Sequence, residues 1–263
     1  MGCRSIQYVI DIIRGKEIAA IKNRLKVYSK LRNKKNIPIV KVVGDSHTSF
    51  FSGHDIINFC HLKNGINNCR DDIENFITFH VGPALAYNLN RYNSSNKARE
   101  KIEYLLDKKY LKSGDTVLLC FGCIDTSVHL LKHIQGPDFN EGVKQASEII
   151  INNYFEFIDK LQALGLKIYL WAALPQEKFV PEELDESIKR NKAVKIYNEL
   201  LNIRAEKSDI KVLSVFDNLI NEDFTMKQQY FLDGAHLNQK AWEFALDEVK
   251  KIDILKDFKI KDD

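Results

Sequence analysis

Short apolar segments alternate with longer amphipathic segments along most of this chain. Five of the short segments are rich in β-branched and aromatic residues and are apolar at consecutive positions: IPIVKVVG (37–44), FITFHVG (76–82), DTVLLCFG (115–122), LKIYLWAALP (166–175) and DIKVLSVFD (209–217). Strands that are apolar on both faces are typical of a parallel sheet buried between two layers of helices. The pattern therefore predicts a five-stranded parallel sheet.

The segments between these strands have the spacing of amphipathic helices. The predicted helices cover residues 49–60, 83–90, 97–109, 141–164, 187–206 and 238–250. Gly165 follows the longest of them, at the kind of position where a helix commonly ends. Strands that alternate with helices in this way predict an α/β protein, a three-layer α/β/α sandwich with right-handed crossovers.

Residues 1–36 differ from the rest in charge, with ten Lys or Arg against two acidic residues, a net charge of +8. Their apolar positions recur at helical spacing, at Ile6, Val9, Ile10, Ile13, Ile18, Ile21 and Leu25. This pattern predicts one or two basic amphipathic helices. They either dock on the rest of the protein or contact an anionic membrane surface. We therefore expect a helical extension over 1–36 and one domain over 37–263.

Composition excludes several classes of protein. Hydrophobic residues make up 44% of the 263 positions, which is enough for a sizeable core. No apolar run reaches the roughly 20 residues that cross a bilayer, and the first apolar stretch is interrupted by Asp11 and followed by Arg14 rather than by a cleavage site. The sequence thus predicts a cytoplasmic protein, or one bound peripherally at the inner membrane face, with no nucleic-acid partner.

Cysteine usage predicts neither a disulfide framework nor a metal site. The five cysteines are odd in number. Cys120 and Cys123 form a C-x-x-C pair, but no second pair or histidine pair follows at the spacing of a zinc site.

Polar residues with catalytic chemistry follow the first and fifth predicted strands, at the carboxyl ends where loops converge in a parallel sheet. Serine becomes a nucleophile when a histidine takes its proton, and a carboxylate orients that histidine. Ser46 follows the first strand, and Asp233 and His236 lie beyond the fifth. Asp233 and His236 are three residues apart, so one turn can aim both at the same serine. Asn238 can cap the helix that follows.

The motifs GDSH (44–47) and DGAHL (233–237) resemble the first and last sequence blocks of the SGNH, or GDSL, hydrolase superfamily. These proteins are esterases and acyl transferases with a flavodoxin-like α/β/α fold, and the resemblance covers roughly residues 37–250. It implies that Ser46 is the nucleophile and that its own N–H is one oxyanion donor. Asp233 and His236 match the Asp-x-x-His pair. Gly82 matches the glycine whose N–H is a second donor.

One block departs from the family pattern. Family members usually have Gly-x-Asn-Asp, where the Asn side chain is the third oxyanion donor, whereas FGCID (121–125) has Ile124 at that position. Losing one such donor typically costs about 10² to 10³ in rate. The N–H of Cys123 or the side chain of His129 can compensate. We expect Asp125 to bind substrate hydroxyls or a neighbouring backbone segment. We expect Asp45 and His47, beside the nucleophile, and also His129 to bind substrate.

The same stretch resembles a subset of SGNH-like proteins in which the block reads Phe-Gly-Glu-Ile-Asp-Cys-Arg, a block associated with bacterial surface-polysaccharide synthesis. Cys123 replaces the Glu and Ser127 replaces the Arg. The resemblances imply an enzyme that acts on a glycan through an acyl-Ser46 intermediate. The expected activity is sugar O-acetyl transfer, with acetyl-CoA as donor substrate and no bound cofactor. The alternatives are a carbohydrate O-acetylesterase and a catalytically silent glycan-binding protein.

Overall fold

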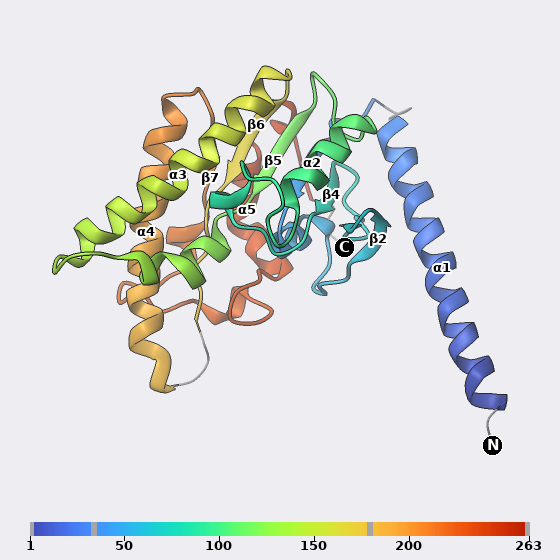
Figure 1. Ribbon diagram of the computed structural model, residues 1–263, viewed down its shortest axis with the longest axis horizontal. Helices are drawn as coiled ribbons and strands as arrows, with labels where there is room; N and C mark the ends of the chain where they lie inside the picture. Colours follow the sequence, from blue (N-terminus) through green and yellow to red (C-terminus); the bar gives the residue numbers. More distant parts are fainter. Residues whose placement is uncertain (1–2, 33–35, 178–180, 261–263) are drawn as a thin grey trace.

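The computed structural model describes the backbone of residues 3–32, 36–177 and 181–260, with side chains for all of these except residues 3–16 and 181. At its centre lies a seven-stranded sheet in the order β2-β3-β4-β1-β5-β6-β7 (Figure 1). Five neighbouring strands run parallel: β1 (Val40–Gly44), β4 (Phe76–His80), β5 (Thr116–Cys120), β6 (Lys167–Trp171) and β7 (Val212–Leu213). These are the five predicted strands. Numbered in chain order they lie as 2-1-3-4-5, which is the flavodoxin-like order.

The other two strands correct the prediction. β2 (Cys60–Lys63) and β3 (Ile66–Asn68) form an antiparallel hairpin at the edge of the sheet, next to β4. The helix predicted over 49–60 is wrong, because the chain forms only the short helix η1 (Ser46–Ser52) before Gly53 ends it in a left-handed conformation. The hairpin turns at Asn64 and Gly65, which both have positive φ, and Asn-Gly is the pair that such turns favour.

Four predicted helices are confirmed within a few residues. They are α2 (Ala98–Asp107), α3 (Phe139–Ala163), α4 (Leu184–Glu206) and α5 (Trp242–Val249), the last preceded by η8 (Gln239–Ala241). The helix predicted over 83–90 shrinks to η2 (Ala86–Asn88). The remaining short helices are η3 (Asp125–His129, a π-helix), η4 (Leu130–His133), η5 (Pro181–Glu183), η6 (Phe216–Asn218), η7 (Gln228–Tyr230) and η9 (Asp253–Leu255).

Helices cover both faces of the sheet, as a three-layer sandwich requires. α2, α3 and α4 lie on one face (Figure 1). On the other face, Phe50 and Phe51 of η1 pack against Trp242 of α5, with ring centroids 4.8 and 6.0 Å apart. Burying these large rings against the strands stabilises the η1 segment, whose first residue is Ser46. The two layers therefore hold the carboxyl edge of β1 in place.

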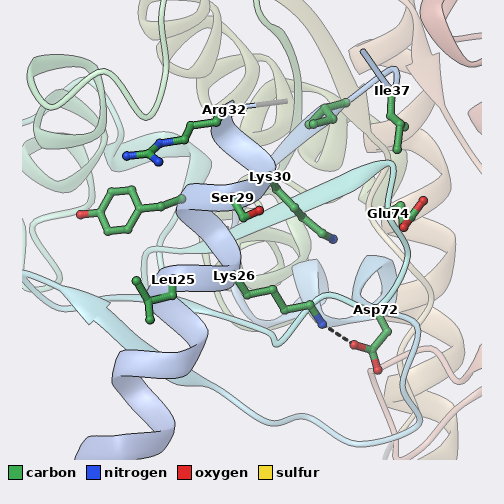
Figure 2. Close-up of a pocket in the computed structure, with 10 residues that line it drawn as sticks. Leu25, Lys26, Ser29, Lys30, Arg32, Ile37, Asp72 and Glu74 are labelled. Carbon is green, nitrogen blue, oxygen red and sulfur yellow. Dashed lines mark hydrogen bonds and ion pairs between the residues drawn. The ribbon is translucent and has the colours of Figure 1, made fainter. Parts of the chain in front are cut away.

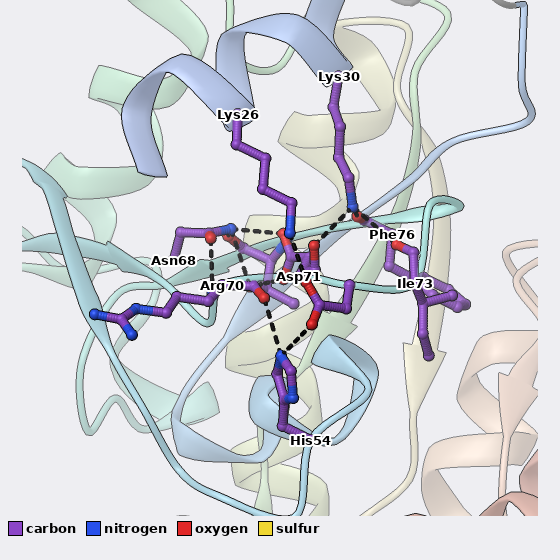
Figure 3. Close-up of polar contacts among 10 residues, drawn as sticks. Lys26, Lys30, His54, Asn68, Arg70, Asp71, Ile73 and Phe76 are labelled. Carbon is purple, nitrogen blue, oxygen red and sulfur yellow. Dashed lines mark hydrogen bonds and ion pairs between the residues drawn. The ribbon is translucent and has the colours of Figure 1, made fainter. Parts of the chain in front are cut away.

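The N-terminal segment forms one continuous helix, α1 (Cys3–Arg32), and its last turns dock on the domain. Lys30 Nζ donates hydrogen bonds to the backbone carbonyls of Asp71, Ile73 and Phe76, at 3.2, 2.8 and 2.9 Å (Figure 3). Burial lowers the pKa of Lys30, although Asp71 opposes this shift. The rest of α1 extends away from the domain (Figure 1). The predicted apolar positions Ile6 to Ile13 have side chains outside the described part, and the domain boundary at residue 36 stays a prediction.

Candidate active site

Ser46 stands at the carboxyl end of β1, where the chain leaves the sheet. Gly44 allows the close approach of β1 and β5, since a Cβ at this position would lie 2.2 Å from the carbonyl oxygen of Cys120. The next residue, Asp45, is the N-cap of η1, and its side chain accepts a hydrogen bond from the N–H of His47 at 3.0 Å. The strand end and the cap together fix Ser46 on the first turn of η1.

The Asp233–His236 segment is a tight turn whose backbone holds the carboxylate. Asp233 Oδ1 accepts hydrogen bonds from the N–H groups of Ala235 and His236, both at 2.8 Å. Gly234 lies against another loop, because a Cβ there would meet the carbonyl oxygen of Glu177 at 2.1 Å. Asn238 caps η8, as predicted, by accepting from the N–H of Lys240. Both ends of the turn are therefore anchored.

The structure brings Ser46, His236 and Asp233 together across 190 residues of sequence. His236 Nε2 lies 2.7 Å from Ser46 Oγ, and His236 Nδ1 lies 2.9 Å from Asp233 Oδ2. Burial alone raises the pKa of Asp233, but hydrogen bonds from His236 and from the Ala235 N–H outweigh it, so this pKa lies below its ordinary value. The carboxylate stays ionised at neutral pH, and it can hold the Nδ1 proton while Nε2 accepts one from serine.

His47 and Asp45 flank the serine from inside the protein. The imidazole of His47 stacks on that of His236, with centroids 4.9 Å apart. Burial, and then the charge of His236, lower the pKa of His47 to about 3, so His47 is neutral at physiological pH. Asp45 has no exposed surface, and burial raises its pKa to about 8. The prediction that Asp45 binds substrate is therefore wrong, whereas substrate contact by His47 stays a prediction.

Three backbone N–H groups were predicted to stabilise an oxyanion, those of Ser46, Gly82 and Cys123. None of them donates a hydrogen bond to the part of the chain that the structure describes. The Val81 N–H donates to the Gly44 carbonyl, so the chain that carries Gly82 passes beside the end of β1. Gly82 has a φ of +96° and packs on Asn96, which leaves no room for a side chain. Their role as oxyanion donors stays a prediction.

Comparison with protein-family models gives no match, and comparison with curated proteins gives none either. Several solved structures do match. A GDSL-like lipase from Bacteroides thetaiotaomicron is 14% identical over 86% of this chain and 91% of its own, with a TM-score of 0.54. A protein described as an acylhydrolase, from Bacteroides fragilis, is 12% identical over 85% and 91%, with a TM-score of 0.51. One described as a platelet activating factor, from Streptococcus pneumonia, is 16% identical over 98% and 99%, with a TM-score of 0.50. The chain has the SGNH hydrolase fold.

In this SGNH fold the acidic residue of the FGCID block (121–125), Asp125, has a structural role. Asp125 is buried, and its carboxylate accepts hydrogen bonds from the N–H groups of Ala86 and Tyr87, at 2.7 and 3.1 Å. Burial raises the pKa of Asp125 to about 6 against these hydrogen bonds. Of the two expected roles, binding of a neighbouring backbone is confirmed, whereas direct contact with substrate stays a prediction, because Asp125 also lines a cavity of about 510 Å³. Ile124 is half-buried and offers no donor in place of the usual Asn.

Two residues that no motif indicated hold the histidine turn of the SGNH fold in place. Glu177 accepts from the Met226 N–H at 2.9 Å, and its own N–H donates to the carbonyl of Gly234. Gln239 donates through Nε2 to the carbonyls of Phe50 and His54, so it connects the histidine turn to η1. Both act through backbone groups of distant loops. No local signal in the sequence could have identified them.

Two cavities are lined by residues named above as candidates for the site. One of about 310 Å³ lies beside Asp233; its lining also includes Ser127, Gln176 and Arg190. Another of about 510 Å³ lies between η2, the π-helix η3 and α3, and it is lined by Leu85, Arg91, His129, His133 and Ile150, among others. His129 therefore faces a cavity, while its predicted part in the oxyanion site stays a prediction. A larger cavity of about 700 Å³ lies between α1 and Asp72 (Figure 2), away from this site.

Proposed function

We propose that this protein is a serine-dependent acyl-ester enzyme and that it transfers acetyl groups to a glycan. The observation that carries the proposal is the contact of Ser46 Oγ with His236 Nε2 at 2.7 Å, with Asp233 2.9 Å from the other ring nitrogen. A single hydrogen bond between a serine and a histidine is weak support, because packing alone can produce it. The ordered chain of serine, imidazole and ionised carboxylate at one sheet edge is the arrangement that nucleophilic acyl transfer needs.

In the first half-reaction, Ser46 Oγ attacks the acyl carbon while its proton passes to His236 Nε2. The tetrahedral oxyanion is stabilised by the N–H groups of Ser46, Gly82 and Cys123. The intermediate collapses to acyl-Ser46 when the C–X bond of the donor breaks and the leaving group takes the proton from His236. In the second half-reaction, a sugar hydroxyl gives its proton to His236 and attacks the acyl carbon, which returns the proton and the free hydroxyl to Ser46.

Two cavities, one beside Asp233 and one lined by Asp125 and His129, support separate sites for donor and acceptor. The smaller one offers Ser127, Gln176 and Arg190, the donors and acceptors that recognise sugar hydroxyls, next to the histidine turn. The larger one combines the apolar side chains of Leu85 and Ile150 with Arg91 and imidazoles. This mixture suits acetyl-CoA, because its pantetheine arm is largely apolar and its phosphates are anionic.

The direct test is labelling with a fluorophosphonate probe and turnover of p-nitrophenyl acetate by the wild type, Ser46→Ala and Ser29→Ala. Ser29 is an exposed serine of α1 and serves as the matched control. We expect labelling and turnover in the wild type and in Ser29→Ala, with loss of both in Ser46→Ala. An unlabelled wild type without Ser46-dependent turnover would favour a silent glycan-binding protein.

Hydrolysis is the second candidate function, because the similar structures include proteins described as a lipase and an acylhydrolase. Water would then replace the sugar hydroxyl in the second half-reaction. Incubation with acetyl-CoA and candidate glycans, followed by mass spectrometry of the glycan, separates the two. A mass gain of one acetyl group supports transfer. Deacetylation of an acetylated glycan without transfer to any acceptor supports an esterase.

A further inference from the structure

α1 carries an apolar stripe that the domain leaves largely exposed. Ile18, Ile21 and Leu25 are 54%, 50% and 63% exposed. They are spaced by three and four residues, so they lie on one face of the helix. Val27 and Asn23, on the opposite face, are buried against the domain. The helix therefore uses one face to dock and presents a second apolar face to its surroundings.

The domain does not cover this stripe. Most of α1 extends clear of the other elements (Figure 1). Where the helix does approach the domain, Leu25 points to the side opposite Lys26, which reaches Asp72 (Figure 2). Three adjacent large aliphatic side chains in this position are unfavourable to leave in water, because removing apolar surface from water is a main favourable contribution to association. An exposed stripe of this kind is typical of a docking surface.

Positive charge accompanies the stripe. Among the described side chains of α1, five are basic and one, Glu17, is acidic. Lys26 and Lys30 contact the domain, which leaves Lys22, Arg24 and Arg32 for the exposed side of the helix. A cavity of about 470 Å³ beside α1 is lined by Lys22, Lys26 and Arg70, and also by Ile56, which is 68% exposed. The one acidic side chain in that lining, Asp72, already contacts Lys26 (Figure 2) and His54. The surface is therefore apolar in the middle and cationic at its border.

We propose that this face of α1 binds the surface of an anionic lipid bilayer. An interfacial helix combines an apolar face, which enters the headgroup region, with Lys and Arg beside it, which meet anionic lipid phosphates. No helix in the described chain could cross a bilayer, so the contact is peripheral. A second copy of this chain is a poor occupant of the stripe, because two segments that each carry +8 over residues 1–36 would repel one another.

The proposal is independent of the acyl chemistry. The stripe lies on α1, and none of its residues contacts Ser46, His236 or Asp233 in the described structure. If the proposal that α1 binds a bilayer is wrong, turnover of p-nitrophenyl acetate is unaffected. If the proposed function is wrong, lipid binding is unaffected.

The test is co-sedimentation of the full chain with vesicles of phosphatidylcholine alone or with about one-third phosphatidylglycerol. The variant Ile21→Asp/Leu25→Asp removes the stripe at exposed positions, so the domain should still fold, which circular dichroism and thermal unfolding check. The matched control is Leu164→Asp/Ile203→Asp, which places the same two charges at residues that are 54% and 51% exposed, at the C-cap of α3 and on α4.

We expect binding to the anionic vesicles, a loss of about tenfold or more in the stripe variant, and no loss in the control. Binding should weaken as NaCl rises from about 0.1 M to about 0.5 M, because salt screens the basic side chains. No binding by the wild type overturns the proposal, and so does equal binding by the stripe variant. A dimer in light scattering that the stripe variant dissociates overturns it in favour of a second copy.

Discussion

Replacing Asp233 by asparagine tests the proposed catalytic arrangement with almost no change in side-chain volume. In the wild-type protein, Oδ1 accepts two backbone N–H groups at 2.8 Å, and Oδ2 lies 2.9 Å from Nδ1 of His236. An asparagine keeps its oxygen on the two N–H groups, because only the oxygen can accept them. Its NH2 group therefore takes the place of Oδ2 and donates to Nδ1.

That donation reverses the role of the histidine. With Nδ1 accepting a hydrogen bond, the neutral imidazole carries its proton on Nε2, which faces Ser46 Oγ at 2.7 Å. A protonated Nε2 cannot take the serine proton. The corresponding substitution in a serine protease lowers kcat by about 10⁴. At 1.36 kcal/mol per tenfold, we expect a barrier higher by about 5 kcal/mol here.

The assay is the initial rate of p-nitrophenyl acetate hydrolysis at neutral pH, with thermal unfolding measured in parallel. Asp223→Asn is the control, because Asp223 is an exposed carboxylate that accepts a backbone N–H at 2.9 Å, from Thr225, and is not hydrogen-bonded to the site. The control should keep wild-type activity. If Asp233→Asn folds normally and retains a tenth or more of the wild-type kcat, the assigned role of Asp233 in orienting His236 is refuted.

Three other substitutions test the surroundings of Ser46. Ile124→Asn restores the side-chain donor of the family pattern, and kcat for p-nitrophenyl acetate should rise by about 10-fold or more; an unchanged kcat would mean that the backbone donors suffice. His47→Phe keeps a ring stacked on His236 but removes an imidazole whose pKa in the folded protein is about 3. When the pH falls from 6 to 4, the free energy of unfolding, measured with urea, should therefore decrease by about 2 to 3 kcal/mol less in the variant than in the wild type. Asp45, with its pKa raised to about 8, binds a proton in the folded state that the unfolded state releases near pH 4, so stability present at low pH is lost as pH rises through 8. In the same unfolding assay, the free energy of unfolding of the wild type should decrease by about 1.4 kcal/mol per pH unit between pH 6.5 and 8, and Asp45→Asn should remove this decrease.

The parallel strands could be predicted because each depends on local pattern. A strand buried on both faces must be apolar at successive positions, whatever its neighbours are. The hairpin at Cys60–Asn68 carried its own local signal, Asn64-Gly65 between alternating residues, which the helical spacing of the preceding segment obscured. The short helix after Ser46 ended early because Gly53 adopts a left-handed conformation, and hydrophobic spacing does not report backbone conformation.

In the candidate site, too, some features are local in sequence and others depend on packing between distant elements. The turn from Asp233 to His236 is local, because Asp233 Oδ1 binds N–H groups two and three residues ahead. The motif therefore carries its geometry with it. The burial of Asp45 is not local, since it results from packing by several elements, and so the sequence could not exclude this residue as a substrate ligand.

By itself, the sequence determined the five parallel strands, the longer helices, the basic character of α1 and the identity of the serine, histidine and aspartate, since all of these follow from side-chain chemistry at short range. Only the tertiary structure decided that Ser46 and His236 meet, because sheet order and the packing of η1 bring together residues 190 positions apart. It also decided which N–H groups are left without partners around Ser46, because every residue type except proline has that group and only the path of the backbone selects among them.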